Sequence, residues 1–189
     1  MSGKGSNAQQ LLAHFAEADL AGVALLVTNR QGSGAFDLGR RYQVPAVLLA
    51  GQQHTQGPTV LQLLLRYHID LVVLAGYLKL IPAEVVAAYP RRILNIHPAL
   101  LPAYGGPGMY GARVHQAVLR GGEAHSGITI HYVDEVYDRG EIIFQETLPI
   151  EPGWTPEQLQ QAIHRLEHAH FPQVVEKICR ELHSQRDKS

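Results

Sequence analysis

The stretch from Ile93 to Gly111 reads ILNIHPALLPAYGGPGMYG, and its character changes half-way along. Its first residues form an apolar β-type run that carries Asn95 and His97, and prolines and glycines then replace the apolar pattern. Proline removes a backbone donor and glycine permits turns, so the second half predicts a long loop after a short strand. A strand that delivers polar side chains to a loop at a sheet edge is the usual setting of a site in α/β proteins.

Asn95 and His97 are two residues apart, so on a strand their side chains project from the same face. An amide beside an imidazole can polarise a carbonyl and stabilise the oxyanion that forms when a nucleophile adds to it. The alternative is a buried histidine next to an asparagine that only joins the loop to the sheet. Short motifs of this kind do not decide between the two interpretations.

Apolar runs and amphipathic segments alternate on the amino-terminal side of this stretch. The expected strands are residues 22–28, 44–49, 69–75 and 93–97, and the expected helices between them are residues 35–42, 57–68 and 82–88. Strands and helices that alternate at short spacing indicate an α/β fold with a mostly parallel sheet and right-handed crossovers.

The carboxyl-terminal side departs from this alternation. A short helix is expected at residues 114–120, followed by two alternating strands at 126–133 and 141–148 that can form a hairpin-like antiparallel extension. Their connection, DEVYDRG, carries Asp134 and Asp138, and either carboxylate can fold back toward His97. Carboxylates in turns are also common as solvated turn formers, which is the alternative for both.

A long helix is expected at the carboxyl end of the chain. Thr155 and Gln158 stand in the positions of a capping box at its start, and Pro172 is expected to kink or split it. No internal repeat or linker interrupts the pattern, so we expect a single domain over residues 1–189.

The amino-terminal sequence SGKGSN is a glycine-rich turn that leads into a helix. We expect Ser6 or Asn7 to cap this helix. Such a turn presents backbone N–H groups and the positive end of the helix to an anion, typically a phosphate. In doubly wound folds the same loop follows a buried strand, and here only Met1 precedes it, so a flexible terminus that caps a helix is the alternative.

Composition excludes several classes of protein. The chain has 46% hydrophobic and 17% charged residues, which is typical of a soluble globular domain. Its formal net charge of -1 gives no electrostatic reason to bind nucleic acid. We find no long apolar span and no signal peptide, and the single cysteine fits a reducing compartment, so we expect a cytoplasmic protein without membrane partners. The eleven histidines are scattered without metal-site spacing, and we expect no metal.

Several segments together resemble one family. ILNIHPALLP, LVVLAGYLKLIP, YDRGEIIFQ, RLEHAHFP and the opening SGKGSN are similar to the phosphoribosylglycinamide formyltransferases, which are folate-dependent enzymes of purine synthesis. The resemblance covers nearly the whole chain in order, which makes it more specific than any single motif. It implies a single-domain, doubly wound, Rossmann-like formyltransferase fold: a mostly parallel sheet with an antiparallel carboxyl-terminal extension.

The resemblance also implies a role for each matching position. The family's catalytic trio corresponds to Asn95, His97 and Asp138. The substrate phosphate would be held by Gly5, Ser6 and Asn7, and the glycinamide portion by Glu167 and Pro98. The folate pocket would be lined by Leu78, Lys79, Leu80, Ile81 and the loop from Asp134 to Asp138. Lys79 stands where relatives often carry arginine, so folate contacts there are expected to differ.

The implied reaction is attack by the amine of glycinamide ribonucleotide on the formyl carbon of 10-formyltetrahydrofolate, the co-substrate. Protonated His97 and Asn95 would stabilise the oxyanion. Asp138 would hold the imidazolium, raise the pKa of His97 and help relay a proton, directly or through water. The partners would be small-molecule substrates, with no nucleic acid, membrane or metal, and the enzyme would be a monomer or homodimer.

One departure from the family concerns the start of the chain. Family members begin with a hydrophobic strand before the phosphate loop, and this strand is missing here. A misassigned start, a truncation or a rearranged sheet would explain it. A buried strand contributes several large side chains at about 1.5–3 kcal/mol each, so we expect the chain to be destabilised, with a mobile phosphate loop and poor substrate affinity. Equal stability and KM in a chain extended upstream would contradict this.

Other assignments are considered beside this one. Formyltetrahydrofolate deformylase and methionyl-tRNA formyltransferase resemble the same core but carry additional domains, for which this chain has no room. The GSN loop and Glu167 match the sugar-nucleotide formyltransferases less well than they match the phosphoribosylglycinamide formyltransferases. A catalytically weak, truncated ligand-binding remnant is disfavoured by the intact trio. The assignment as a dinucleotide-binding module has weaker support, because SGKGSN does not match the GxGxxG motif of such modules.

Overall fold

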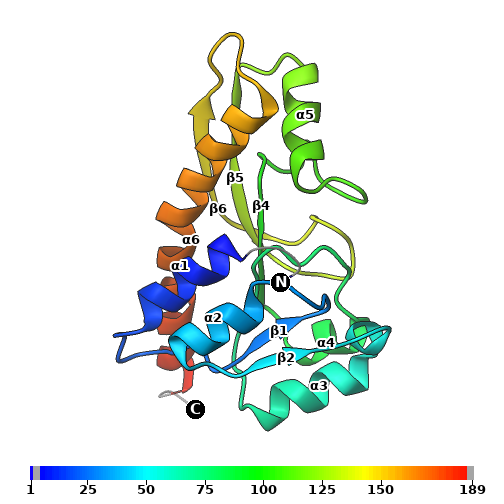
Figure 1. Ribbon diagram of the computed structural model, residues 1–189, viewed down its shortest axis with the longest axis vertical. Coiled ribbons are helices and arrows are strands. Elements are labelled where there is room, and N and C mark those ends of the chain that lie inside the picture. Colours follow the sequence, from blue (N-terminus) through cyan, green and yellow to red (C-terminus); the bar gives the residue numbers. More distant parts are fainter. Residues whose placement is uncertain (2–4, 187–189) are drawn as a thin grey trace.

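The computed structural model describes Met1 and residues 5–186, in which six strands form two sheets (Figure 1). The smaller sheet pairs β1 (Leu26–Thr28) with β2 (Ala46–Leu48) in parallel. The larger has the order β3-β4-β5-β6, formed by β3 (Val72–Leu74), β4 (Ile93–His97), β5 (His125–Tyr132) and β6 (Ile142–Pro149). β3 and β4 are parallel, and β5 and β6 continue the sheet antiparallel. The predicted α/β arrangement of parallel strands with an antiparallel extension is confirmed.

Helices alternate with the strands as the sequence pattern predicts. They are α1 (Ser6–Phe15), α2 (Ala35–Tyr42), α3 (Gly57–Arg66), α4 (Ala83–Ala88), α5 (Ala112–Arg120) and α6 (Pro156–Arg186), with a 3-10 turn η1 at Gln53–Thr55. Figure 1 shows α1 crossing α6 on one side and α3 beside α4 at the end that carries β1 and β2. Helix α3 ends two residues before the expected position, because His68 takes a left-handed φ of 50°.

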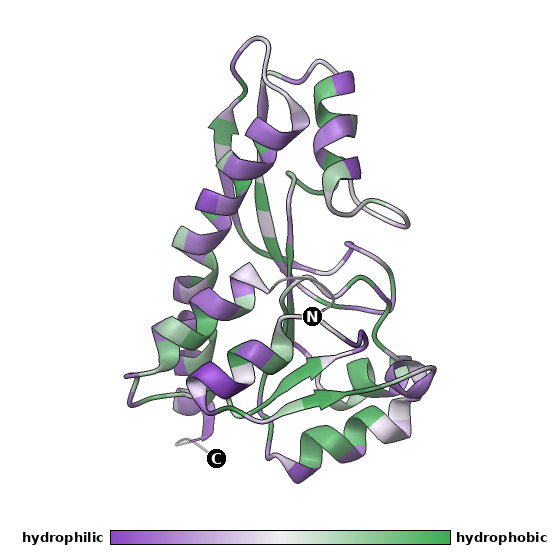
Figure 2. Cartoon of the chain, in the orientation of Figure 1, coloured by the Kyte–Doolittle hydropathy of each residue, from purple (hydrophilic) through white to green (hydrophobic). Residues whose placement is uncertain are grey.

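The main core lies between β4, β5 and α6. Leu94 of β4 and Ile128 and Ile130 of β5 are fully buried, and so are Ile163 and Phe171 of α6. Figure 2 shows the hydrophobic residues concentrated on the strands and on the inward side of the helices. β4 is therefore paired with a strand on both edges and packed on both faces. This packing holds the polar side chains that β4 carries in fixed positions.

Helix α6 runs without interruption through Pro172, so the predicted split is wrong. Pro172 is itself buried, as are Phe171 before it and Val174 and Val175 after it, so packing on both sides of the proline holds the helix together. The predicted capping box at its start is confirmed. Although α6 has 31 residues, neither it nor another helix in the described part of the chain is apolar enough to cross a membrane.

The start of α1 differs from the prediction. Gly5, with a left-handed φ of 83°, is the residue before the helix, and no side chain caps it. Ser6 and Asn7 lie inside the first turn, so the expectation that one of them caps the helix is wrong. Glycine reaches this φ without steric cost, which lets the helix start here. Among the described residues, no side chain caps the first N–H groups of α1. The other residues of SGKGSN, Ser2 to Lys4, lie outside the described residues.

Candidate active site

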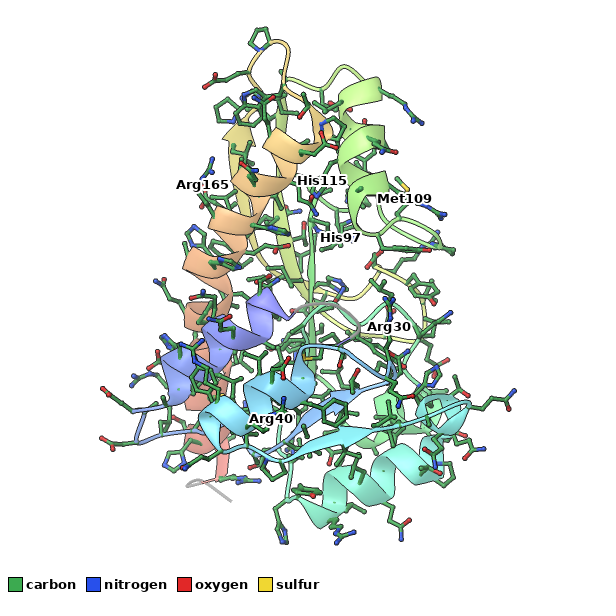
Figure 3. All side chains as sticks on the ribbon, in the orientation of Figure 1. Arg30, Arg40, His97, Met109, His115 and Arg165 are labelled. Carbon is green, nitrogen blue, oxygen red and sulfur yellow. The ribbon has the colours of Figure 1, made fainter. Side chains whose placement is uncertain are left out.

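A cavity of about 850 Å³ opens where β3 and β4 end, and every site residue predicted from the sequence lies on its wall. In Figure 3, His97 lies in the middle of the molecule between α5 and α6, with His115 next to it and Met109 in the loop before α5. The predicted residues on the wall are Gly5, Ser6, Asn7, Leu78, Lys79, Leu80, Ile81, Asn95, His97, Pro98, Asp134, Asp138 and Glu167. Residues far apart in sequence therefore meet at one place.

Asn95 and His97 reach the cavity from the same face of β4, as their spacing predicts. The Asn95 Nδ2 atom lies 3.1 Å from Nε2 of His131, on the neighbouring strand β5. The other ring nitrogen of His131, Nδ1, lies 2.7 Å from the Tyr132 carbonyl oxygen. A carbonyl can only accept, so His131 donates from Nδ1 and accepts from Asn95 at Nε2. This contact fixes the amide of Asn95 and leaves its second N–H for a ligand.

Asp138, and not Asp134, is the carboxylate that faces His97. One of its oxygens, Oδ2, accepts a hydrogen bond of 2.8 Å from the Gly106 N–H and lies 3.5 Å from Nδ1 of His97. The other oxygen lies 3.7 Å from Nε2 of His131. Asp134 lines the same cavity but accepts a hydrogen bond from the Val136 N–H, as a turn former does. The alternative that the sequence left open is thereby resolved.

His97 has an acceptor at each ring nitrogen, since Nε2 lies 2.8 Å from the Tyr104 carbonyl oxygen and Nδ1 faces Asp138. Burial nevertheless lowers the pKa of His97 below its usual value and outweighs the opposing effect of the Asp138 charge. Asp138 thus raises the pKa of His97 as predicted, but burial lowers it by more, so the net shift in the ligand-free protein is downward. The reason is that only 3% of His97 is exposed, so the cost of burying a charge exceeds the gain from one partner.

The other end of the cavity holds a second buried carboxyl group. Glu167 projects from α6 and is 6% exposed, and its Oε2 accepts a hydrogen bond of 2.9 Å from Nδ2 of Asn7. Burial raises the pKa of Glu167 to about 7, although the bond from Asn7 opposes the rise. The first turn of α1 lies beside it, since Asn7 belongs to that turn. This end therefore offers positive helix-end dipoles for an anion and a carboxyl group for a cation or amine.

Part of the cavity wall is apolar. The segment from Leu78 to Ile81 lines it, and the side chains of Leu78 and Leu80 are exposed. Val136 and Tyr137 of the loop between β5 and β6 lie on the same cavity wall, and Val136 is exposed as well. Exposed apolar side chains around a concave opening are typical of a site for a flat, partly apolar ligand.

The comparison with protein families agrees with this geometry, since the family model described as Formyl transferase matches residues 1–175. The chain belongs to the formyl transferase family. Among the relatives of this formyl transferase is the chloroplastic phosphoribosylglycinamide formyltransferase of Arabidopsis thaliana, 43% identical over 96% of this chain and 64% of the relative. The phosphoribosylglycinamide formyltransferase of Bacillus subtilis is 34% identical over 94% of this chain and 91% of the relative. This chain spans less than two thirds of the length of the Arabidopsis protein.

Solved structures of the family share the fold of this formyl transferase. A glycinamide ribonucleotide transformylase from Symbiobacterium toebii matches with a TM-score of 0.87 and 32% identity, over 96% of this chain and 85% of that one. A second, from Geobacillus kaustophilus, matches with a TM-score of 0.84 and 36% identity, over 94% of this chain and 95% of that one. The predicted formyltransferase fold is confirmed.

Several residues on the cavity wall of this formyl transferase were not predicted: Arg30, Met109, Tyr110, Gln160 and His164. The sequence could have indicated Arg30, because it is the first charged residue after a buried parallel strand. Ligands of α/β folds bind at this end of such strands.

His115 and His131 also line the cavity. Burial, with smaller effects of the His164 and His97 charges, lowers the pKa of His115 to about 4, so it is neutral at pH 7. His131 holds the amide of Asn95 and lies 3.7 Å from Asp138. Within the described residues, no group of three histidine, cysteine or acidic side chains is arranged to hold a metal.

Proposed function

We propose that this formyl transferase moves the formyl group of 10-formyltetrahydrofolate to the amine of glycinamide ribonucleotide in purine synthesis. The observation that carries the proposal is the set of groups on the wall of one cavity. The wall holds Asn95, His97 and Asp138, the segment at residues 78–81, and Glu167 beside the first turn of α1. These groups suit a reaction centre, a folate pocket, and a site for an amine with a phosphate.

We assign the binding roles on the same basis. The N–H groups after Gly5, in the first turn of α1, hold the phosphate, since a helix start favours an anion. Glu167 receives the glycinamide amine, next to Pro98 on the cavity wall. The pterin ring of the folate lies between Leu78–Ile81 and the loop Asp134–Asp138. We expect the enzyme to need no metal and to work in the cytoplasm as a monomer or homodimer.

The reaction then proceeds by addition and elimination. The amine nitrogen forms a bond to the formyl carbon, and the carbonyl π electrons move to its oxygen. The second N–H of Asn95 donates to that oxyanion, and the imidazolium of His97, whose ring nitrogens face Tyr104 and Asp138, stabilises it by its positive charge. The intermediate collapses, the bond from carbon to the folate nitrogen breaks, and the proton lost by the amine passes to that nitrogen by way of Asp138 and His97, directly or through water. The product is the formamide of the amine substrate.

The charge of His97 follows from this scheme. In the ligand-free protein burial keeps its pKa low. The developing oxyanion adds a second negative group beside the ring, next to Asp138, and each negative group favours the imidazolium. The ring is therefore neutral at rest and gains its charge as the intermediate forms, when the charge stabilises the reaction.

The proposal is tested by a spectrophotometric assay of the 10-formyl folate donor, with and without glycinamide ribonucleotide. We expect deformylation of the folate to depend on the amine and to yield one formylated amine for each folate released. Deformylation at the same rate without the amine would mean that water is the acceptor, and the deformylase alternative would replace the proposal.

Gly5 provides a test of the phosphate site. A Cβ added at Gly5 would collide with the end of the Met1 side chain, and the backbone has a left-handed φ of 83°, which strains any residue other than glycine. We expect Gly5→Ala to displace the start of α1 and to raise the KM for glycinamide ribonucleotide at least about tenfold, because the aligned N–H groups move. The KM for the folate should change less than about twofold.

Gly51→Ala is the matched control for this substitution. Gly51 also has a left-handed φ, 57°, but a Cβ there would meet no atom within 4 Å, and Gly51 is outside the cavity wall. The control should lose about 1 kcal/mol of stability and keep its KM values. Equal KM values in both variants would argue against a phosphate site at Gly5.

A further inference from the structure

The loop after β4 returns to His97 at residues 104–106, where its backbone contacts both groups of the pair formed by His97 and Asp138. The carbonyl oxygen of Tyr104 lies 2.8 Å from Nε2 of His97. Two residues later, the N–H of Gly106 donates a hydrogen bond of 2.8 Å to Oδ2 of Asp138. That same oxygen lies 3.5 Å from Nδ1 of His97. One short stretch of backbone therefore orients both the ring and the carboxylate.

These contacts determine which ring nitrogen of His97 carries the proton while the ring is neutral. A carbonyl oxygen only accepts hydrogen bonds, so the proton is on Nε2 and points to Tyr104. Nδ1 is then bare, and it faces the carboxylate of Asp138, which is also only an acceptor at pH 7. Two acceptors make no hydrogen bond with each other. A proton that is added to the ring therefore enters at Nδ1, where it completes a hydrogen bond to Asp138.

The first part of this loop is anchored to the sheet by buried side chains. Thr129 is fully buried on β5, and its hydroxyl donates a hydrogen bond of 2.7 Å to the Ala99 carbonyl. The same hydroxyl accepts one of 3.0 Å from the Leu101 N–H. Gln145 of β6 donates another, of 3.0 Å, to the Leu101 carbonyl. These bonds fix the loop as far as Leu101 but leave Tyr104 three residues beyond the anchor.

Tyr104 has an anchor of its own in its phenol group. The hydroxyl donates a hydrogen bond of 2.6 Å to Oε1 of Glu123, just after α5. This bond raises the pKa of the Tyr104 phenol, so the hydroxyl remains a donor. The Tyr104 backbone has a left-handed φ of 57°, which is unfavourable for tyrosine and persists only where contacts hold it. The phenol contact therefore keeps the Tyr104 carbonyl in its place at His97.

We propose that Tyr104 is a positioning residue that sets the tautomer of His97, and that the bond from its phenol to Glu123 holds its carbonyl for this purpose. The proton route rests on the proposed function. The proton lost by the amine nitrogen enters the ring at Nδ1, on the side of Asp138, directly or through water. It leaves from Nδ1 to the folate nitrogen when the bond from that nitrogen to the formyl carbon breaks. The Nε2 proton stays with Tyr104 throughout.

A displaced Tyr104 carbonyl gives the neutral ring another arrangement. The ring proton then moves to Nδ1 and donates to Asp138, so Nδ1 can no longer take up the proton of the amine. Burial lowers the pKa of His97, whereas the Asp138 charge and the bond to the Tyr104 carbonyl raise it, so losing that bond lowers the pKa further. His131 and His115 are the other titratable groups that act on the ring, and the substitutions that test the proposal leave both in place.

The test records nitrogen NMR spectra of the ligand-free protein with isotope-labelled histidine, in which a protonated ring nitrogen is distinguished from a bare one. The His97 signals are assigned by their absence from His97→Asn, and we expect the Nε2–H tautomer alone in the parent at pH 8. Tyr104→Phe removes the hydroxyl. Gly121→Ala displaces it, because the added Cβ collides with the phenol oxygen while the Gly121 φ of -69° suits alanine. Both variants should show at least about a fifth of the Nδ1–H form.

Kinetics of the same variants test the proton route. We expect Tyr104→Phe and Gly121→Ala to lower kcat about 5- to 20-fold with both KM values within about twofold of the parent. Glu123→Gln keeps an oxygen that accepts from the phenol, so it should retain the parent tautomer and more than about half of kcat. Tyr67→Phe, which alters a partly buried tyrosine outside the cavity wall, is the control for loss of a phenol and should change neither.

The outcomes that overturn the proposal are distinct from those that overturn the proposed function. An Nδ1–H tautomer in the parent overturns it, and so does a parent-like tautomer in both Tyr104→Phe and Gly121→Ala, even if kcat falls. An altered tautomer with unchanged kcat overturns the proton route. The tautomer is read without substrates, so it tests the role of Tyr104 even if the assay shows deformylation that does not depend on the amine.

Discussion

Replacing Asp138 by asparagine is expected to lower kcat about 10²- to 10⁴-fold while the protein remains folded. Asp138 is the carboxylate nearest His97, with 3.5 Å between Oδ2 and Nδ1. The asparagine oxygen can still accept the Gly106 N–H, so the loop keeps its anchor, but the negative charge beside the imidazole is lost. Without that charge the imidazolium that faces the oxyanion is disfavoured, and burial alone already lowers the pKa of His97. The loss should therefore appear in kcat and much less in KM.

Glu135→Gln is the matched control for Asp138→Asn. It removes one carboxylate from the same loop, and Glu135 is exposed and lies outside the cavity wall. Steady-state kinetics of both variants should show a loss for Asp138→Asn alone, with both melting temperatures within about 3 °C of the parent. An Asp138→Asn variant that keeps more than about half of the parent kcat would remove this residue from the proposed mechanism, whatever the effect of Glu135→Gln.

The elements of this fold that local patterns determine were predictable. Ile93–His97 reads as a buried strand because apolar residues flank two polar ones, and the structure has β4 over the same residues. The spacing of Asn95 and His97 follows from the period of a strand and needs no tertiary information. The capping box at Thr155 and Gln158 is equally local, with hydrogen bonds of 2.8 and 3.3 Å between backbone N–H groups and the opposite side chains.

Features that depend on tertiary contacts were not predictable in the same way. Asparagine is a residue type that commonly caps helices, but the side chain of Asn7 donates to Glu167, which lies 160 positions away in sequence. The choice between Asp134 and Asp138 depends on how one loop folds, with a left-handed φ of 56° at Asp138. The pKa of His97 depends on burial, which no residue spacing encodes. The family resemblance located these residues, whereas their contacts and charge states came from the structure.

Glu167→Gln is expected to make the protein more stable and less active, with both effects dependent on pH. The pKa of Glu167 is raised to about 7, mainly by burial. A carboxyl group whose pKa is higher in the folded than in the unfolded state destabilises the fold when it ionises. This cost is absent below about pH 4.5, grows as the pH rises and is complete above about pH 7. At pH 8 it amounts to about 3 kcal/mol, which the neutral amide avoids.

The stability effect is measured by thermal unfolding at pH 5 and pH 8. At pH 8 we expect the Tm of Glu167→Gln to exceed that of the parent by about 6–12 °C, and at pH 5 by less than about 3 °C. Glutamine keeps an oxygen for the Asn7 amide, so the hydrogen bond of 2.9 Å is retained. The control is Glu181→Gln on the same helix, which removes an exposed carboxylate 3.9 Å from Lys177 and should change stability by less than about 1 kcal/mol.

The kinetic effect of Glu167→Gln has the opposite sign. In the proposed function the carboxylate of Glu167 receives the amine of glycinamide ribonucleotide, and an amide holds a charged donor less strongly. We expect kcat/KM for the amine substrate to fall about 10- to 100-fold at pH 8, with the KM for the folate nearly unchanged. In the parent, kcat/KM should rise as the pH increases through about 7, and this rise should be lost in the variant. A variant that is stabilised at pH 8 yet keeps the parent kcat/KM would show that Glu167 is buried for a reason other than amine binding.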